Sequence, residues 1–249
     1  MTASSDPAAV PNIDEPPLHD RPARGRRQQM MLASLWFALF AQWMTVVPII
    51  LPHRVAAIVG DRHPQRDGIV GIVGSVVAAG AFVALLVAPL AGALSDAHRS
   101  VRGQRRFFLI TGSAGSMLGL LSLLLFGPGS SLLWYTLAFL NLQFWWNWAA
   151  GAYAGLIPDV VATQDRGAAS GWLNLMSVLG TITGNGLLAA LYAPGRPGAA
   201  IVFVLLTLGC LLLTLAAARE PGSPSSRAFG WRRFFATLFV PLREHPAFY

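Results

Sequence analysis

The amino-acid sequence predicts an all-α polytopic membrane protein with six transmembrane helices. Long stretches contain no Asp, Glu, Lys or Arg, and the longest extends from Phe107 to Pro158. A helix that crosses a bilayer needs roughly 20 predominantly apolar residues, so this stretch alone has room for two. Hydrophobic residues make up 54% of the chain and charged residues 12%, which is about half the charged fraction of a soluble domain. An ordinary soluble domain is therefore excluded.

Six apolar runs follow one another, separated by charged residues or by segments rich in Gly and Pro. The first run is too long for the apolar part of a cleavable signal peptide, and it lacks a small-residue cleavage site. Before it, residues 1–29 lack apolar periodicity, which is typical of a disordered cytoplasmic tail. We expect a bundle over residues 30–218. Its transmembrane helices are expected at approximately residues 30–52, 68–94, 107–127, 131–157, 168–192 and 199–218.

The basic residues predict the orientation of this bundle. All eighteen are arginine, and Lys and Arg accumulate in the short cytoplasmic loops of membrane proteins. With both termini in the cytoplasm, every arginine lies on the cytoplasmic side except Arg54, Arg62, Arg66 and Arg196. The net charge of +7 suggests nucleic acid at first sight, but orientation in a bilayer explains loop arginines better. We expect no nucleic-acid partner and a plasma membrane of bacterial type.

Reporter fusions test this topology. A reporter fused after Arg106 or after Tyr249 is expected to behave as cytoplasmic, and one fused within residues 55–65 as external, because of the arginine distribution. Green fluorescent protein, which fluoresces inside the cell, and alkaline phosphatase, which is active outside it, make a complementary pair. An external reporter after Arg106 would overturn the predicted topology.

Uncharged amides are the most polar side chains within the six runs. Gln143 and Asn147 are four residues apart, so they share a helix face, and both lie near the middle of the fourth run. Gln42 lies at a similar depth in the first run. Amides offer paired donors and acceptors that can hold the hydroxyls of a sugar, so these three are candidate substrate-binding residues. Hydrogen bonds between neighbouring helices are the alternative.

The fourth run is also rich in aromatic residues. Trp145, Trp146 and Trp148 are too deep to be anchors at the membrane interface, and they point in different directions around a helix. At most one or two of them could line a cavity, where an aromatic face suits a sugar ring or another flat substrate. Trp148 is the candidate, and packing between helices is the alternative.

Glycine pairs at G-x-x-x-G spacing recur within the runs. Such pairs let helix backbones approach closely, so we expect tight packing around them. For the fifth run a hinge that includes Gly186 is the alternative. The pairs are Gly115/Gly119, Gly151/Gly155 and Gly180/Gly184.

The loop between the second and third runs carries a family resemblance. Its sequence, GALSDAHRSVRGQRR, resembles the cytoplasmic loop between spans two and three of the major facilitator superfamily, and its spacing is similar to that in sucrose transporters and related glycoside cation symporters. Ala97, Gln104 and Phe107 depart from the family pattern. In the family this loop belongs to a cytoplasmic gate; a simple orientation signal is the alternative. The resemblance implies the gate role for Gly92, Asp96, Arg102, Gly103, Arg105 and Arg106.

A second loop strengthens the resemblance. The segment from Ile157 to Gly171 is similar to the loop between spans four and five of many facilitator transporters. Its matching residues are Asp159, Arg166 and Gly167. The two loops together extend the resemblance over spans two to five.

The resemblance implies a fold and a function. Facilitators consist of two six-span halves, each built from two inverted three-helix repeats, with the substrate held at the midplane. This chain resembles one half, so the expected function is transport of a small solute, a sugar or glycoside, by alternating access. The expected partners are the lipid bilayer, the solute, and either a missing C-terminal six-span half or a second copy. Residues 219–249 are expected to form a cytoplasmic amphipathic connector, with the chain truncated before its second half.

Other classes of protein are also open to the sequence. An intramembrane enzyme needs nucleophile, acid and base groups or metal ligands brought together, whereas the five histidines are scattered through tail and loops. We therefore expect no enzyme, no cofactor and no metal, and a non-transporting membrane scaffold or interaction protein is the alternative to a carrier. The symporter relatives use a membrane-embedded carboxylate, which the six runs lack. Any proton-coupling group is expected outside them.

Overall fold

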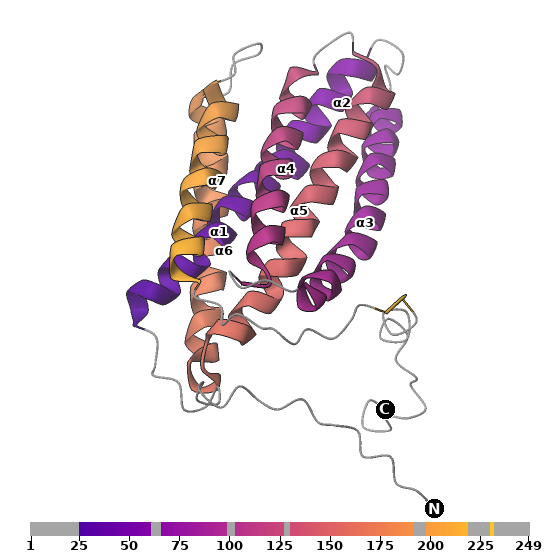
Figure 1. The fold of residues 1–249 in the computed structure, drawn as a ribbon. Helices are drawn as coiled ribbons and strands as arrows, with labels where there is room; N and C mark the ends of the chain where they lie inside the picture. Colours follow the sequence, from indigo (N-terminus) through magenta and orange to yellow (C-terminus); the bar gives the residue numbers. More distant parts are fainter. Residues whose placement is uncertain are drawn as a thin grey trace, which may run out of the picture.

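A computed structural model of the chain describes residues 25–60, 66–98, 103–126, 130–191, 198–218 and 230–231 (Figure 1). The longer described segments are helical, and no strand occurs among these residues. The elements are α1 (Arg26–Thr45), the π-helix η1 (Val46–Ile50), α2 (Leu51–Val59), α3 (Arg66–Ala97), α4 (Arg106–Leu125), α5 (Leu132–Val160), the 3-10 helix η2 (Thr163–Asp165), α6 (Arg166–Leu191) and α7 (Gly198–Ala217).

The first helical segment is longer than the sequence predicts at both ends. α1, η1 and α2 follow one another without a break from Arg26 to Val59. Residues 26–29 of the predicted tail therefore belong to α1, because Arg and Gln are good helix formers and Gln29 is buried in the bundle. The widened turn η1 contains Pro48, which has no N–H for the regular helical hydrogen bond. Residues 1–24, 219–229 and 232–249 lie outside the described residues, so the predicted tail and the predicted connector over residues 219–249 fall almost entirely outside them.

Five helical segments are long and apolar enough to cross a membrane: Arg26–Val59, Gly68–Ala97, Arg106–Leu124, Thr163–Leu191 and Gly198–Ala217. The prediction of an all-α chain with transmembrane helices is thereby confirmed for the described residues. α5 has 29 residues, but it is not among these five segments. Its role as a sixth span stays a prediction.

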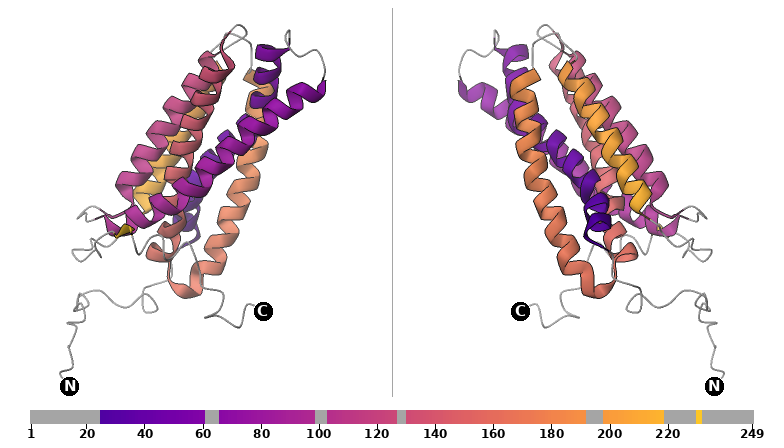
Figure 2. Two further views of the ribbon diagram at one scale, coloured as in Figure 1. Left: turned by 90° about the vertical axis from the view of Figure 1, so that its right-hand side faces the viewer. Right: turned by 90° about the vertical axis from the view of Figure 1, so that its left-hand side faces the viewer.

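The helices pair in a regular pattern. α1 packs against α6 and α7, α5 packs against α3 and α4, and α4 also contacts α7. The side views in Figure 2 show α6 running beside α1 and α7 beside α4. α1 and α5 therefore act as the two central helices, each between two partners. Most of the buried residues lie along these contacts.

Glycines lie at the closest crossings. A Cβ atom added to Gly180 or Gly184 of α6 would lie 2.3 Å from a backbone carbonyl oxygen of α1, that of Phe37 or of Ala41. A Cβ at Gly151 of α5 would lie 2.2 Å from the carbonyl oxygen of Ala88 in α3. Backbones this close leave no room for a side chain, so these glycines serve helix packing. α6 continues as a regular helix through Gly180 and Gly184, without the interruption that a hinge would show.

Candidate functional site

A buried arginine organises one end of the bundle. Arg105 directly precedes α4, and its side chain is only 7% exposed. Its Nη2 lies 2.6 Å from Oδ1 of Asp96 at the end of α3, and its Nε donates to Oδ2 of Asp159 near the end of α5 at 2.6 Å. Buried charges occur in proteins where they are paired and hydrogen-bonded. One guanidinium thus ties together the ends of α3, α4 and α5.

Further contacts fix the guanidinium in place. Nη1 of Arg105 donates to the Ser95 hydroxyl at 2.9 Å, and that hydroxyl donates in turn to the carbonyl of Gly92 at 2.7 Å. Gly155 of α5 lies directly under the guanidinium, because a Cβ at this position would come 2.1 Å from Nη1 of Arg105. The Arg105 network, which we define as Asp96, Arg105, Asp159, Ser95 and Gly155, is therefore built from three helices.

The chain enters this network through a turn that needs glycine. Gly103 has a φ of 114°, a conformation that side-chain-bearing residues rarely adopt. This explains why the loop places a glycine two residues before Arg105. Gly92 contributes its backbone carbonyl, which accepts from Ser95; a Cβ there would make only an ordinary contact, 3.6 Å from the carbonyl oxygen of Gly151 on α5.

The other residues of the two loop motifs have separate contacts. Nη2 of Arg106 donates to the carbonyl of Leu215 at 2.8 Å, which links α4 to the end of α7. Nη2 of Arg166 donates to the carbonyl of Pro158 at 3.0 Å, which links the start of α6 to the end of α5. Gly167 is exposed at the start of α6. Arg102 lies outside the described residues.

Gln42 is fully buried between α1 and α7. Its side chain is 1% exposed, and its Nε2 donates to the hydroxyl of Thr207, which donates to the carbonyl of Phe203 at 2.8 Å. Its Oε1 is buried without a hydrogen-bond partner among the described residues. The amide therefore links two helices while one acceptor stays unsatisfied.

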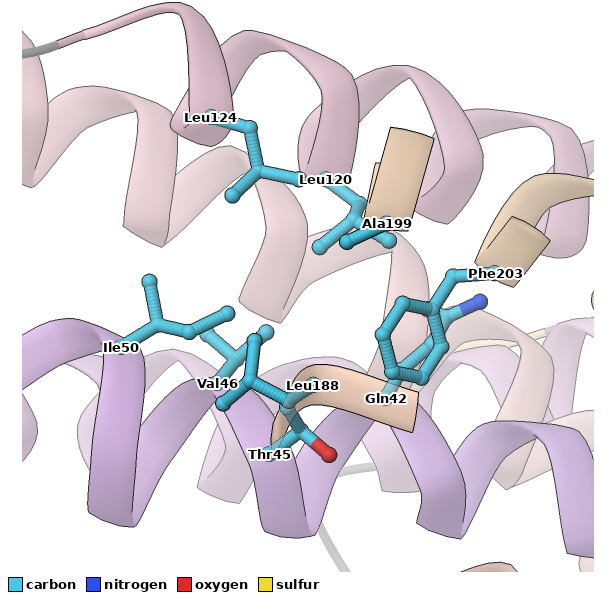
Figure 3. Close-up of a pocket in the computed structure, with 9 residues that line it drawn as sticks. All are labelled: Gln42, Thr45, Val46, Ile50, Leu120, Leu124, Leu188, Ala199 and Phe203. Carbon is cyan, nitrogen blue, oxygen red and sulfur yellow. The ribbon is translucent and has the colours of Figure 1, made fainter. Parts of the chain in front are cut away.

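Gln42 also borders a small hollow where α1, α4, α6 and α7 meet. Figure 3 shows Leu120 and Leu124 facing Val46 and Ile50 across it. Its free space amounts to about 10 Å³, room for about one water molecule. A sugar does not fit this hollow in the conformation described. The full lining consists of Gln42, Thr45, Val46, Ile50, Leu120, Leu124, Leu188, Ala199 and Phe203.

Gln143 of α5 faces α3, whereas Gln42 faces α7. Gln143 is 2% exposed, and its Nε2 would lie 2.7 Å from a Cβ at Gly80 of α3. Its Oε1 is likewise buried without a partner within the described part of the chain. Nδ2 of Asn147 donates to the carbonyl of Gln143 at 2.8 Å. The structure thus places Gln143 and Asn147 together, but directs Gln143 to α3 and Gln42 to α7.

Trp148 lies between α4 and α5, on another side of α5. Its ring stacks on Phe108 of α4 at 5.2 Å and on Phe144 at 5.7 Å, and its Nε1 donates to the hydroxyl of Thr111 at 3.3 Å. These contacts direct Trp148 to α4, whereas Gln143 is directed to α3 and Gln42 to α7. A different set of rings, which was not predicted from the sequence, lines the space between α1 and α5. Its members on α1 are Trp36, Phe40 and Trp43, whose helical spacing of four and three residues was a visible signal.

Comparison with known proteins adds no assignment. No protein-family model matches this chain. No curated protein matches it either. No group of three or more His, Cys, Asp or Glu side chains that could hold a metal ion occurs in the part of the chain that the structure describes.

Proposed function

We propose that this chain forms half of a membrane carrier for a small solute, a sugar or glycoside, that works by alternating access together with a second six-helix unit. The observation that carries the proposal is a repeated packing pattern between the first three and the last three long helices. The first helix of each set packs on the second and third helices of the other set. α1 packs on α6 and α7, and α5 packs on α3 and α4. Transporters built from inverted repeats have this kind of internal relation.

The pairing can be followed as a symmetry. Counting α1 with α2 as one segment, the first set is α1, α3 and α4, and the second is α5, α6 and α7. Exchanging the sets turns the α1–α6 and α1–α7 contacts into α5–α3 and α5–α4 contacts, all of which occur. The α4–α7 contact is its own counterpart. Because successive membrane helices alternate in direction, helices one and four run oppositely, so two such sets are inverted with respect to each other.

The Arg105 network supports a gating role at one end. By the arginine distribution this end is the cytoplasmic one. Arg105 links three helices through two carboxylates that are 61% and 40% exposed, so water or a partner unit can compete for them. A junction of this kind stabilises one arrangement of helix ends and can be released when a partner offers other charges.

The exposed apolar faces of α3 and α6 support a second unit. Val70, Phe82 and Leu85 of α3 are each more than 60% exposed, and Ile182 of α6 is 65% exposed. Lipid can cover such faces, and so can helices of a second half. We propose the second half, supplied by a further segment of the gene product or by a second copy, because a midplane site needs walls from two units.

Uptake into proteoliposomes tests the proposal. We expect saturable uptake of labelled sucrose, glucose or methyl β-D-glucopyranoside, with the product of the complete reading frame where the frame extends beyond Tyr249, and otherwise with this chain. A protonophore then separates symport from uniport. Empty liposomes and liposomes with the Asp96→Asn variant are the controls, the latter being expected to reduce uptake at equal protein content. Stable membrane insertion with no uptake of any sugar would favour the scaffold alternative.

A further inference from the structure

One side of α5 is left open by its neighbours and carries a regular pattern. The residues on this side recur at intervals of three, four, three and four positions, which is the a/d spacing of a coiled coil. α5 packs between α3 and α4, which are both long and apolar enough to cross a membrane, so this side lies at the depth of the lipid chains. The α5 seam, as we name it, consists of the exposed Trp134, Leu137 and Asn141 and the half-buried Phe144 and Trp148.

Asn141 is the polar member of the seam. It lies about five residues from the middle of α5 (Leu132–Val160), or about 8 Å along the helix axis. Its Oδ1 accepts from Nε1 of Trp145 at 3.2 Å, and its Nδ2 donates no hydrogen bond within the described part of the chain. Lipid chains offer no acceptor, and an unsatisfied polar group in the bilayer costs free energy. The amide therefore calls for a partner other than lipid.

Asn141 points away from the helices that α5 contacts. Trp146, which lies about 140° around the helix from Asn141, donates to the carbonyl of Leu39 in α1. On its other sides α5 approaches α3 at Gly151, and Gly119 of α4 at Leu142. The seam belongs to α5 and not to α3 or α6, whose exposed faces are assigned above to a second unit. Its partner must therefore come from outside that unit.

A second copy of this chain fits the seam. Copies inserted in one orientation carry parallel α5 helices, which can meet about a two-fold axis along the membrane normal. The carboxamide is self-complementary, because Nδ2 of each Asn141 can donate to Oδ1 of the other, and Oδ1 has a second lone pair besides the one that accepts from Trp145. In parallel coiled coils a single Asn at an a position specifies register and oligomeric state. Counting from Trp134 as a, Asn141 is the next a position.

We propose that this chain forms a parallel dimer through the α5 seam, with the two Asn141 amides paired at the two-fold axis within the membrane. Trp134 and Leu137 flank the amide pair on one side. Phe144 and Trp148 flank it on the other, where the Trp148 ring is backed by Phe108 of α4 at 5.2 Å. The dimer goes beyond the proposed function, because it uses a different face and leaves α3 and α6 free for the second unit.

Oxidative cross-linking in lipid vesicles tests whether the seam is the contact. Cys210, the single cysteine of the chain, is buried, so Cys210→Ala gives a background without thiols. In this background Leu137→Cys is expected to form a cross-linked dimer with copper phenanthroline, because it lies on the seam and keeps Asn141. Leu205→Cys of α7 is the matched control, since Leu205 is also exposed but lies on another helix. It is expected to remain uncross-linked.

Single-molecule photobleaching of the fluorescently labelled full chain in vesicles tests the role of the amide. We expect two copies per spot for the wild type, and Asn141→Leu to need about tenfold more protein per lipid for half-association. Asn141→Gln keeps the amide and should cost about threefold at most. Asn174→Leu is the matched control, because Asn174 is an exposed amide on α6. Equal elution and circular dichroism of the variants show that they are folded.

Each result decides for or against the seam. Single copies of the wild type at every protein-to-lipid ratio, or equal association of Asn141→Leu, overturn the dimer. Association that depends on Asn174 and not on Asn141 assigns the second copy to the α6 face and also overturns it, as does equal cross-linking of Leu205→Cys. No readout uses uptake, so the carrier proposal and the dimer can fail separately.

Discussion

The double variant Asp96→Asn/Asp159→Asn is expected to unfold at a lower temperature than the single variant Arg105→Gln. The double variant removes both carboxylates that contact the Arg105 guanidinium among the described residues, and this side chain is only 7% exposed. The single variant leaves two carboxylates that are 61% and 40% exposed, and water can hydrate both of them. Removing the two acids should therefore harm the fold more than removing the base.

The magnitudes follow from this asymmetry. Breaking a fully buried ion pair by removing one partner costs about 3–5 kcal/mol; partial exposure of the acids lowers the expected cost of the double variant to about 2–3 kcal/mol. For Arg105→Gln we expect about 1 kcal/mol, near the upper end for exposed pairs. Thermal unfolding of the purified protein in detergent, followed by circular dichroism, gives the order of the two variants.

The triple variant Asp96→Asn/Arg105→Gln/Asp159→Asn is the internal control. It carries no charge in the network, so it should recover part of the stability that the double variant loses. High salt should change the order little, because a buried charge is screened less than an exposed one. If Arg105→Gln proved the least stable of the three, the acids rather than the arginine would be the group that the fold cannot leave unpaired.

The helical elements could be predicted because the apolar runs carry the signal directly. A membrane helix must satisfy its own backbone hydrogen bonds, so an uninterrupted apolar run leaves few alternatives. Boundaries were less certain, since the extension of the first helix to Val59 depends on a widened turn at Pro48. α5 shows the converse difficulty. It is a continuous helix of 29 residues, yet it is not among the five segments that are long and apolar enough to cross a membrane.

The Arg105 network could be predicted only in part. The sequence identified Asp96, Arg105 and Asp159 as motif residues, on the pattern of two separate loops. It could not show that Arg105 contacts both acids, because Asp159 is 54 residues away in the chain. That contact depends on how α5 packs against α3 and α4, and on the absence of a side chain at Gly155. In the sequence, the spacing of Gly155 indicates only a packing glycine.

The midplane candidates show the same limit. Depth along a helix follows from counting residues, so Gln42, Gln143 and Asn147 could be assigned similar heights from the sequence. The neighbouring helix that a side chain faces cannot be obtained by counting residues. Gln42 is directed to α7, Gln143 to α3 and Trp148 to α4. These directions follow from the neighbouring helices, which the sequence does not identify.

Gly180→Ala and Gly186→Ala are expected to change stability in opposite directions. Both glycines lie in α6, and alanine is the better helix former by about 1 kcal/mol. A Cβ at Gly186 would have no atom within 4 Å among the described residues, apart from its own helix backbone and chain neighbours. The gain in helix propensity should therefore appear there. At Gly180 the Cβ would lie 2.3 Å from the Phe37 carbonyl oxygen, a backbone atom that cannot rotate away.

The expected cost at Gly180 is about 1–3 kcal/mol of overpacking, which exceeds the gain in helix propensity. Gly151→Ala should behave like Gly180→Ala, since its Cβ would lie 2.2 Å from the Ala88 carbonyl oxygen of α3. The two crossings, α1–α6 and α5–α3, are counterparts under the exchange of helix sets. Thermal unfolding of the three variants in detergent measures both effects. A stabilising Gly180→Ala would mean that α1 and α6 lie farther apart than in this structure. A large difference in stability between Gly151→Ala and Gly180→Ala would mean that the two central helices, α1 and α5, are not equivalent. That result would remove the main support for inverted repeats.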